Sequence, residues 1–93
     1  RYIDSLVEKL KSWGEPSEKI NKEIIGNTLQ WLRHQGITDD RSIRGLFYLF
    51  HSRECLTVDT IPEDFRRILC GRDDEGVFKA ETLLIRELGN VPL

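Results

Sequence analysis

Five consecutive apolar residues, Leu46-Phe47-Tyr48-Leu49-Phe50, lie within a stretch whose pattern is otherwise helical. At roughly 100° per residue, such a run covers the whole circumference of an α-helix, so this turn has no ordinary solvent-facing side. A helix of this kind is either buried among several others or half buried, with its remaining side covered by a partner molecule. The run therefore constrains the architecture first and indicates a binding surface second.

The composition is that of an ordinary globular domain. The chain has 93 residues, of which 39% are hydrophobic and 32% charged, enough for one modest core. A formal net charge of −2 provides no long-range field that would attract nucleic acid or an anionic membrane. No apolar stretch approaches the roughly 20 residues of a membrane span. Because the chain begins at Arg1 and contains no methionine, we expect residues 1–93 to be a single helical domain that belongs to a longer protein.

Helical periodicity dominates the chain. Apolar residues recur at the i, i+3, i+4, i+7 spacing of amphipathic helices, which predicts helices over residues 3–13, 17–35, 38–53, 60–71 and 77–88. Glycines are expected to end the first, second and fifth of these at positions 14, 36 and 89. The predicted fold class is therefore all-α, a compact bundle of about five short amphipathic helices.

The starts of two helices carry capping signals. Ser17 is the expected N-cap of the second helix. Thr60-Ile61-Pro62-Glu63 fits a capping box with proline in the first turn of the fourth helix. The alternation in Leu56-Thr57-Val58-Asp59 allows one short extended connector near residues 56–60.

The predicted third helix has two unlike sides. Its inward stripe is expected to be formed by Ile43, Leu46, Phe47 and Phe50. Arg41, Arg44 and Tyr48 project together on the far side, with Leu49 on the flank. Tyrosine and arginine are frequent interface hot spots. We therefore predict a partner-binding surface made by Arg41, Arg44, Tyr48 and Leu49, while a second layer of core around Tyr48 and Leu49 stays open as the alternative.

Catalytic and metal chemistry find little support in the sequence. His34, His51, Cys55 and Cys70 are the only histidines and cysteines, and their spacing lacks the close cysteine pair of a zinc site. No nucleophile elbow, phosphate loop or dinucleotide fingerprint is present. We expect no enzyme, no metal and no cofactor. Two cysteines are too few for a secreted disulfide framework, so free thiols and a cytoplasmic location are expected.

Two functional hypotheses follow. The first is a non-catalytic protein–protein interaction or regulatory (adaptor) module that acts through a helical surface and binds another protein or a second copy of itself. The alternative is a small helix-turn-helix-like transcription regulator, in which residues 30–50 supply a helix, a turn at Gly36 and a DNA-recognition helix. Nucleic acid is the less favoured partner, because that recognition helix would begin with Asp39-Asp40. We expect no membrane association and no small-molecule substrate.

Overall fold

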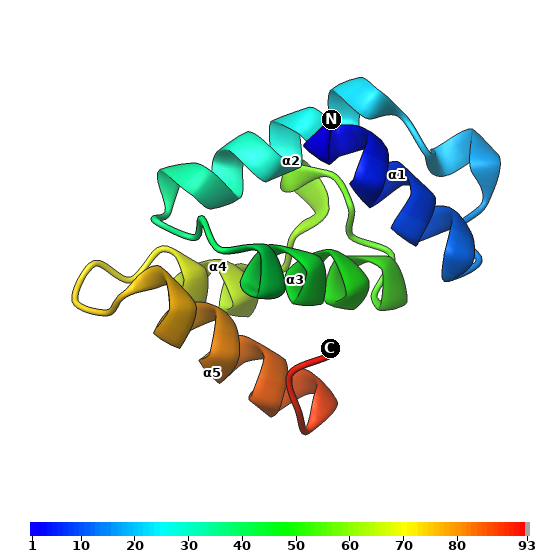
Figure 1. The fold of residues 1–93 in the computed structure, drawn as a ribbon. Helices are drawn as coiled ribbons and strands as arrows, with labels where there is room; N and C mark the ends of the chain where they lie inside the picture. The colour runs from blue at the N-terminus through cyan, green and yellow to red at the C-terminus, as the bar shows by residue number, and fades with distance from the viewer. Residues whose placement is uncertain (93) are drawn as a thin grey trace.

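One helix lies at the centre of the molecule, and the other helices are arranged around it (Figure 1). The structure is a computed structural model that describes residues 1–92. Its elements, in chain order, are α1 (Tyr2–Ser12), η1 (Ser17–Lys19), α2 (Lys22–His34), α3 (Asp40–Ser52), η2 (Val58–Thr60), α4 (Glu63–Leu69) and α5 (Gly76–Leu88), where η denotes a short 3₁₀ helix. No strand occurs within the described residues, and the predicted all-α bundle of five short helices is confirmed.

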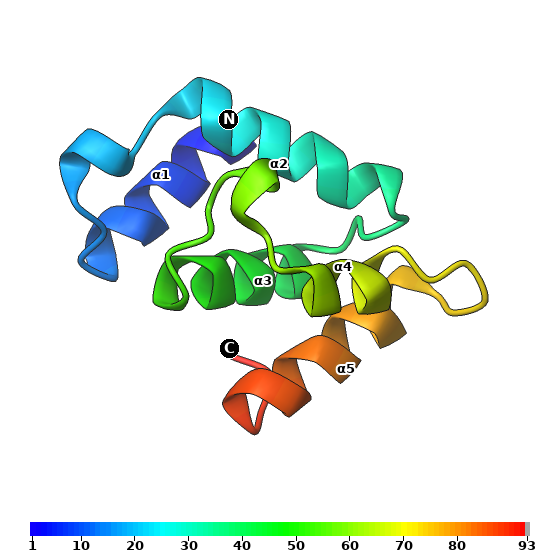
Figure 2. The ribbon, with the colours of Figure 1, turned by 180° about the vertical axis from the view of Figure 1, so that it is seen from behind.

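The central helix is α3. Figures 1 and 2 show α1 and α2 on one side of α3 and α5 on the other, with α4 beside α5. Accordingly α1 packs against α2 and α3, and α5 packs against α3 and α4. The lower side of α5 faces away from the rest of the molecule in both views. Within residues 1–92, none of the helices has the length and apolar character needed to span a membrane.

The core forms where the inward stripes of the helices meet. The predicted stripe of α3 is confirmed, since Ile43, Leu46, Phe47 and Phe50 are all buried. Phe47 and Phe50 pack edge to face with ring centroids 6.3 Å apart. A polar contact lies inside this core: the Thr28 hydroxyl of α2 donates a 2.6 Å hydrogen bond to the Leu56 carbonyl oxygen. That bond ties the connector after α3 to α2.

Three helices end in the same hydrogen-bonded motif. After α1 the Glu15 N–H donates to the Leu10 carbonyl oxygen, and Gly14 adopts a φ of +88°. After α2 the Ile37 N–H donates the corresponding bond to the Leu32 carbonyl oxygen, and the predicted stop at Gly36 adopts a φ of +82°. These are Schellman motifs, in which a left-handed residue reverses the chain. After α3 the left-handed residue is Glu54, with a φ of +55°, and no sequence signal indicated it.

The structure corrects two predicted helix starts. The second helix begins at Lys22 and not at Ser17, because the Asn21 side chain accepts hydrogen bonds from the N–H groups of Glu23 and Ile24. Ser17 belongs to η1 instead. The capping box before α4 is also absent, since the Thr60 hydroxyl donates to the Thr57 carbonyl oxygen and closes η2. The connector near residues 56–60 is therefore a 3₁₀ turn and contains no strand.

Candidate interaction surface

Leu49 is not available to a partner, which corrects one residue of the predicted binding surface. Its side chain is 0% exposed. The physical reason lies one turn earlier in α3, at Gly45, where a Cβ atom would lie only 2.8 Å from Leu84 Cδ1. The missing side chain lets α5 approach α3 closely. Because Gly45 and Leu49 lie on the same side of α3, the helix α5 covers that side.

The other three predicted residues lie on a side of α3 that is only partly covered. Arg41 is exposed, while Arg44 and Tyr48 are half-buried. Arg44 Nε lies 2.8 Å from Asp40 Oδ2, and the Tyr48 ring packs edge to face on Trp13 with centroids 5.1 Å apart. Arg44, Tyr48 and Trp13 line a small depression of about 220 Å³. Both side chains thus have intramolecular contacts, and a binding role for Arg41, Arg44 and Tyr48 stays a prediction.

The burial of α3 also bears on the DNA-binding hypothesis. A recognition helix must present base-reading side chains along one open side. Here α3 lies between α1 and α5, and its open side begins with Asp40 next to the N-cap Asp39. The helix-turn-helix hypothesis stays a prediction that these contacts do not favour.

The exposed apolar side chains of this chain lie on α5. Within the described residues, the large hydrophobic side chains that are exposed are Val77 at 51%, Phe78 at 56% and Ile85 at 51%. Phe78 and Ile85 are seven residues apart, about two helical turns, so they lie on one side of the helix. We call the surface formed by Val77, Phe78 and Ile85 the α5 outer face.

Strong contacts on the opposite side fix the orientation of α5. Ala80, Leu83 and Leu84 are 0% exposed and face the core. The buried Lys79 ammonium group donates hydrogen bonds to the Gln35 carbonyl oxygen at 2.6 Å and to the Gly71 carbonyl oxygen at 2.9 Å. These carbonyl groups follow the ends of α2 and α4, where helices leave acceptors unpaired. Lys79 therefore connects α5 to both neighbouring helix ends.

A close backbone contact holds the first turn of α5. A Cβ atom on Gly76 would lie 2.0 Å from the Gly36 carbonyl oxygen, so only glycine fits between α5 and the α2–α3 loop. With both contacts in place, α5 cannot rotate to bury Val77, Phe78 or Ile85. The exposure of the α5 outer face is thus a consequence of how the rest of the helix is held.

The apolar periodicity that predicts the fifth helix places Val77, Ala80, Leu84 and Leu88 in one stripe. Ala80 and Leu84 are buried, Leu88 is half-buried and Val77 is exposed, so the stripe is wrong at Val77. One sequence signal does indicate the exposed face of α5. As in the third helix, apolar residues occur around the helix circumference. Residues 77–88 carry seven large or small apolar side chains: Val77, Phe78, Ala80, Leu83, Leu84, Ile85 and Leu88.

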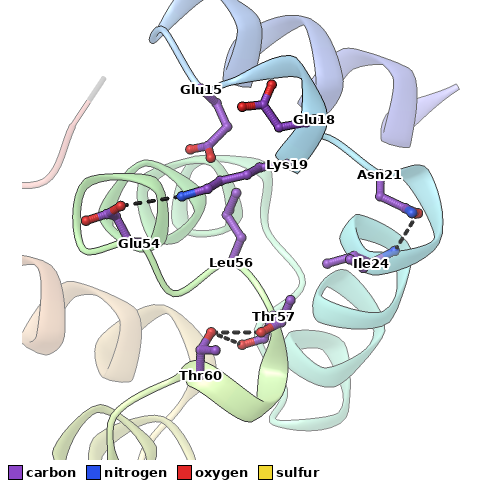
Figure 3. A pocket seen from close by; sticks show the side chains of 9 residues that line it. All are labelled: Glu15, Glu18, Lys19, Asn21, Ile24, Glu54, Leu56, Thr57 and Thr60. Carbon is purple, nitrogen blue, oxygen red and sulfur yellow. Dashed lines mark hydrogen bonds and ion pairs between the residues drawn. The ribbon is translucent and has the colours of Figure 1, made fainter.

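A second hollow lies between η1 and the connector after α3 (Figure 3). This pocket of about 340 Å³ has Ile24 and Leu56 on its apolar side and carboxylates and hydroxyls around them. Most of its polar groups already have intramolecular partners. Lys19 Nζ lies 3.5 Å from Glu54 Oε1, Asn21 caps α2, and the Thr60 hydroxyl is bonded within η2. The pocket therefore offers few free groups to orient a ligand.

The histidines and cysteines do not form a common site. His51 Nδ1 contacts Glu15 Oε1, and both side chains are largely buried. Cys55 is buried and Cys70 is exposed, and neither forms a disulfide. Burial raises the pKa of the Cys55 thiol to about 11, which disfavours the reactive thiolate. In residues 1–92 no group of three or more histidine, cysteine or acidic side chains is arranged to hold a metal ion.

Two local contacts stabilise the start of the chain against α2 and α3. The Tyr2 hydroxyl donates a 2.7 Å hydrogen bond to Asp40 Oδ1, and the guanidinium of Arg33 lies over the Tyr2 ring at 5.8 Å. Desolvation, together with the bond to Asp40, raises the pKa of Tyr2. On the opposite side of α1, hydrogen bonding to Lys22 lowers the pKa of Asp4. These contacts are structural and leave the α5 outer face as the candidate site.

Comparison of the chain with protein-family models, with curated proteins and with solved structures gives no match.

Proposed function

We propose that this chain is a non-catalytic protein–protein interaction module that binds its partner through the α5 outer face. One observation carries the proposal: Val77, Phe78 and Ile85 are each more than half exposed on a helix whose other side is locked into the core. Several exposed apolar side chains on one helix can mark an interaction site in a soluble protein, whereas single ones scattered over the surface need no explanation. The proposal keeps the interaction hypothesis and moves its surface from α3 to α5.

The energetics support binding at this surface. Burying a large apolar side chain contributes about 1.5–3 kcal/mol, so completing the burial of three half-exposed ones supplies a useful part of a binding free energy. Aromatic anchors such as Phe78 concentrate such energy. Because Lys79 and Gly76 already fix α5, little conformational entropy is lost when a partner docks.

The contacts of the reactive groups support the non-catalytic part of the proposal. The Cys55 thiol is buried with a raised pKa, and His51 is engaged by Glu15. We also propose an adaptor role in the cytoplasm, which the two unbonded cysteines support because reducing compartments keep thiols free.

A comparison of three forms of the protein as bait tests the proposal. The wild type, the double variant Phe78→Ser/Ile85→Ser and the control Asn27→Ser/Gln30→Ser are each used to capture proteins from the source cell. Asn27 and Gln30 are exposed polar residues on α2, so the control changes a surface of similar exposure. The proposal predicts bound proteins that the wild type and the control share and the α5 variant loses. Identical recovery by all three forms would contradict it.

A further inference from the structure

Exposed acidic side chains lie on α5 itself and in the loop at its N-terminal end. Glu81 lies on the same side of α5, three residues after Phe78 and four before Ile85. The loop immediately before α5 carries three more carboxylates, and all four residues are exposed: Asp73, Asp74, Glu75 and Glu81. We call these four residues the acidic border.

The carboxylates of the acidic border have no cationic partner among residues 1–92. Arg86, the exposed cation of α5, is already occupied, with Asp64 Oδ2 at 2.6 Å and Glu87 Oε2 at 3.3 Å. Arg72 is the one exposed cation of the preceding loop. The acidic border therefore keeps a net negative charge on α5 and at its N-terminal end, where Asp74 and Glu75 line a hollow with Arg72.

Helix capping does not account for the acidic loop. Carboxylates at a helix N-terminus often accept hydrogen bonds from the first N–H groups. At α5 the N-cap residue is Glu75, and no side chain caps the helix. The three loop carboxylates therefore stay available to a partner.

We propose that the α5 outer face binds a basic amphipathic helix of another protein, an inference that rests on the function proposed above. Apolar side chains of that helix, spaced by two turns, pack on Phe78 and Ile85. Its lysine or arginine side chains lie against Glu81 and the loop carboxylates. Charge complementarity of this kind selects the partner and accelerates association.

The same charges disfavour two other occupants. A symmetric pair of α5 helices would place the same patch against itself, so Glu81 of each copy would approach the acidic side chains of the other. Like charges at an interface oppose association. An anionic membrane surface is disfavoured for the same reason, because helices that bind it carry lysine and arginine around their apolar side.

Two synthetic peptides test the inference. Both are helices of about 18 residues with leucines at identical positions. One carries lysine and the other glutamate at the polar positions. Fluorescence anisotropy of each labelled peptide measures the Kd of its complex with the full chain. The measurement is made at about 50 mM salt, where charge interactions are strong, and at about 300 mM salt, where they are screened. The basic peptide is expected to bind at least tenfold more tightly than the acidic one, with the difference reduced at high salt.

Variants separate the apolar and the charged contributions. Phe78→Ser/Ile85→Ser removes the apolar contacts, and Asp74→Lys/Glu81→Lys reverses charge while leaving the apolar face intact. Glu18→Lys/Glu23→Lys makes the same charge change on exposed residues of η1 and α2. Each α5 variant is expected to weaken binding of the basic peptide at least tenfold, and the control less than twofold. Circular dichroism of every variant confirms that the helices are retained.

Each other outcome overturns the inference in a distinct way. Equal binding of both peptides, or no binding of the basic peptide, rejects the basic partner. The interaction function would still be supported if the serine variant loses proteins that the wild type captures. A concentration-dependent dimer in light scattering that the serine variant abolishes identifies a second copy as the occupant. Binding to phosphatidylglycerol vesicles that depends on Phe78 identifies a membrane surface. Basic-peptide binding that the serine variant leaves unchanged rejects the α5 outer face itself.

Discussion

At the scale of single residues, Lys79 shows how a charged side chain can serve a purely structural purpose. Its ammonium group is buried and donates to two backbone carbonyl oxygens, those of Gln35 and Gly71. Both acceptors follow a helix end, where the helix dipole favours a positive charge. The aliphatic stem of the same side chain lies within the protein, as lysine stems often do.

The first prediction concerns this contact. Lys79→Met keeps the stem but leaves two partly buried carbonyl groups without this donor, so we expect the free energy of unfolding to fall by about 1–3 kcal/mol. Urea denaturation followed by circular dichroism measures the change. Lys11→Met, on an exposed lysine of α1, serves as the control and should change stability by less than about 0.5 kcal/mol. Equal stability of Lys79→Met and the wild type would contradict the assigned role.

The two thiols give a second prediction. Because burial raises the pKa of Cys55 to about 11 while Cys70 is exposed, a disulfide reagent should react rapidly with one thiol of the native chain and with both in denaturant. The Cys70→Ser variant should lose the rapid reaction. Rapid reaction of both native thiols would contradict the buried position of Cys55.

The shift in the Cys55 pKa also sets the pH dependence of stability. The unfolded thiol ionises near its ordinary pKa of 9.0, whereas the folded thiol resists ionisation up to about 11. The stabilising contribution is therefore complete below pH 9.0 and decreases as the pH rises toward about 11. The Cys55→Ala variant should lack this part of the alkaline decrease in the free energy of unfolding.

At the scale of helices, the end of α3 gives a third prediction. Glu54 adopts a left-handed conformation that costs a residue with a side chain about 1–2 kcal/mol, whereas glycine adopts it freely. Glu54→Gly should therefore raise the free energy of unfolding by up to about 1 kcal/mol, after the greater entropy of unfolded glycine is subtracted. Thermal and urea denaturation measure the change.

The matched control makes the opposite change, from glycine to a residue with a side chain, at Gly14, the left-handed residue after α1. A Cβ on Gly14 would meet no atom within 4 Å, so Gly14→Ala tests conformation alone. It should lower stability by about 1 kcal/mol. A loss of stability in Glu54→Gly, or none in Gly14→Ala, would contradict this account of the helix ends.

Periodicity and glycine positions predicted the five helices because both report local backbone preferences. The start of α2 was predicted wrongly at Ser17, because serine and asparagine are N-caps of similar strength and the chain uses Asn21. The left-handed Glu54 could not be predicted, because the packing of Cys55 and Leu56 after it determines that turn and glutamate is not a usual residue there.

The candidate site depended on tertiary contacts that the sequence does not specify. The rule that a helix apolar on all sides needs extra cover applies to both α3 and α5. Only the structure shows that α5 itself covers Leu49, through the space left by Gly45, and that nothing in residues 1–92 covers Phe78 and Ile85. The sequence pattern favoured the third helix because the continuous run at 46–50 is more conspicuous than the dispersed apolar residues of 77–88.

At the scale of the whole molecule, α3 is the centre and α5 is an edge helix with apolar residues on two sides. One of those sides completes the core, and the other is the α5 outer face, which also carries Glu81. An edge helix whose first turn is held by Gly76 and Lys79, and whose Leu84 packs on Gly45, is well suited to present a rigid binding surface. We propose that this surface docks a partner protein.

Site-specific photocrosslinking tests that claim most directly. The photoreactive residue benzoylphenylalanine replaces Phe78 in one form of the protein and Gln30, on the exposed side of α2, in another. Irradiation in the source cell should give discrete heavier products from position 78 and none from position 30. No product from position 78, or the same products from both positions, would contradict the claim that the α5 outer face is the binding surface.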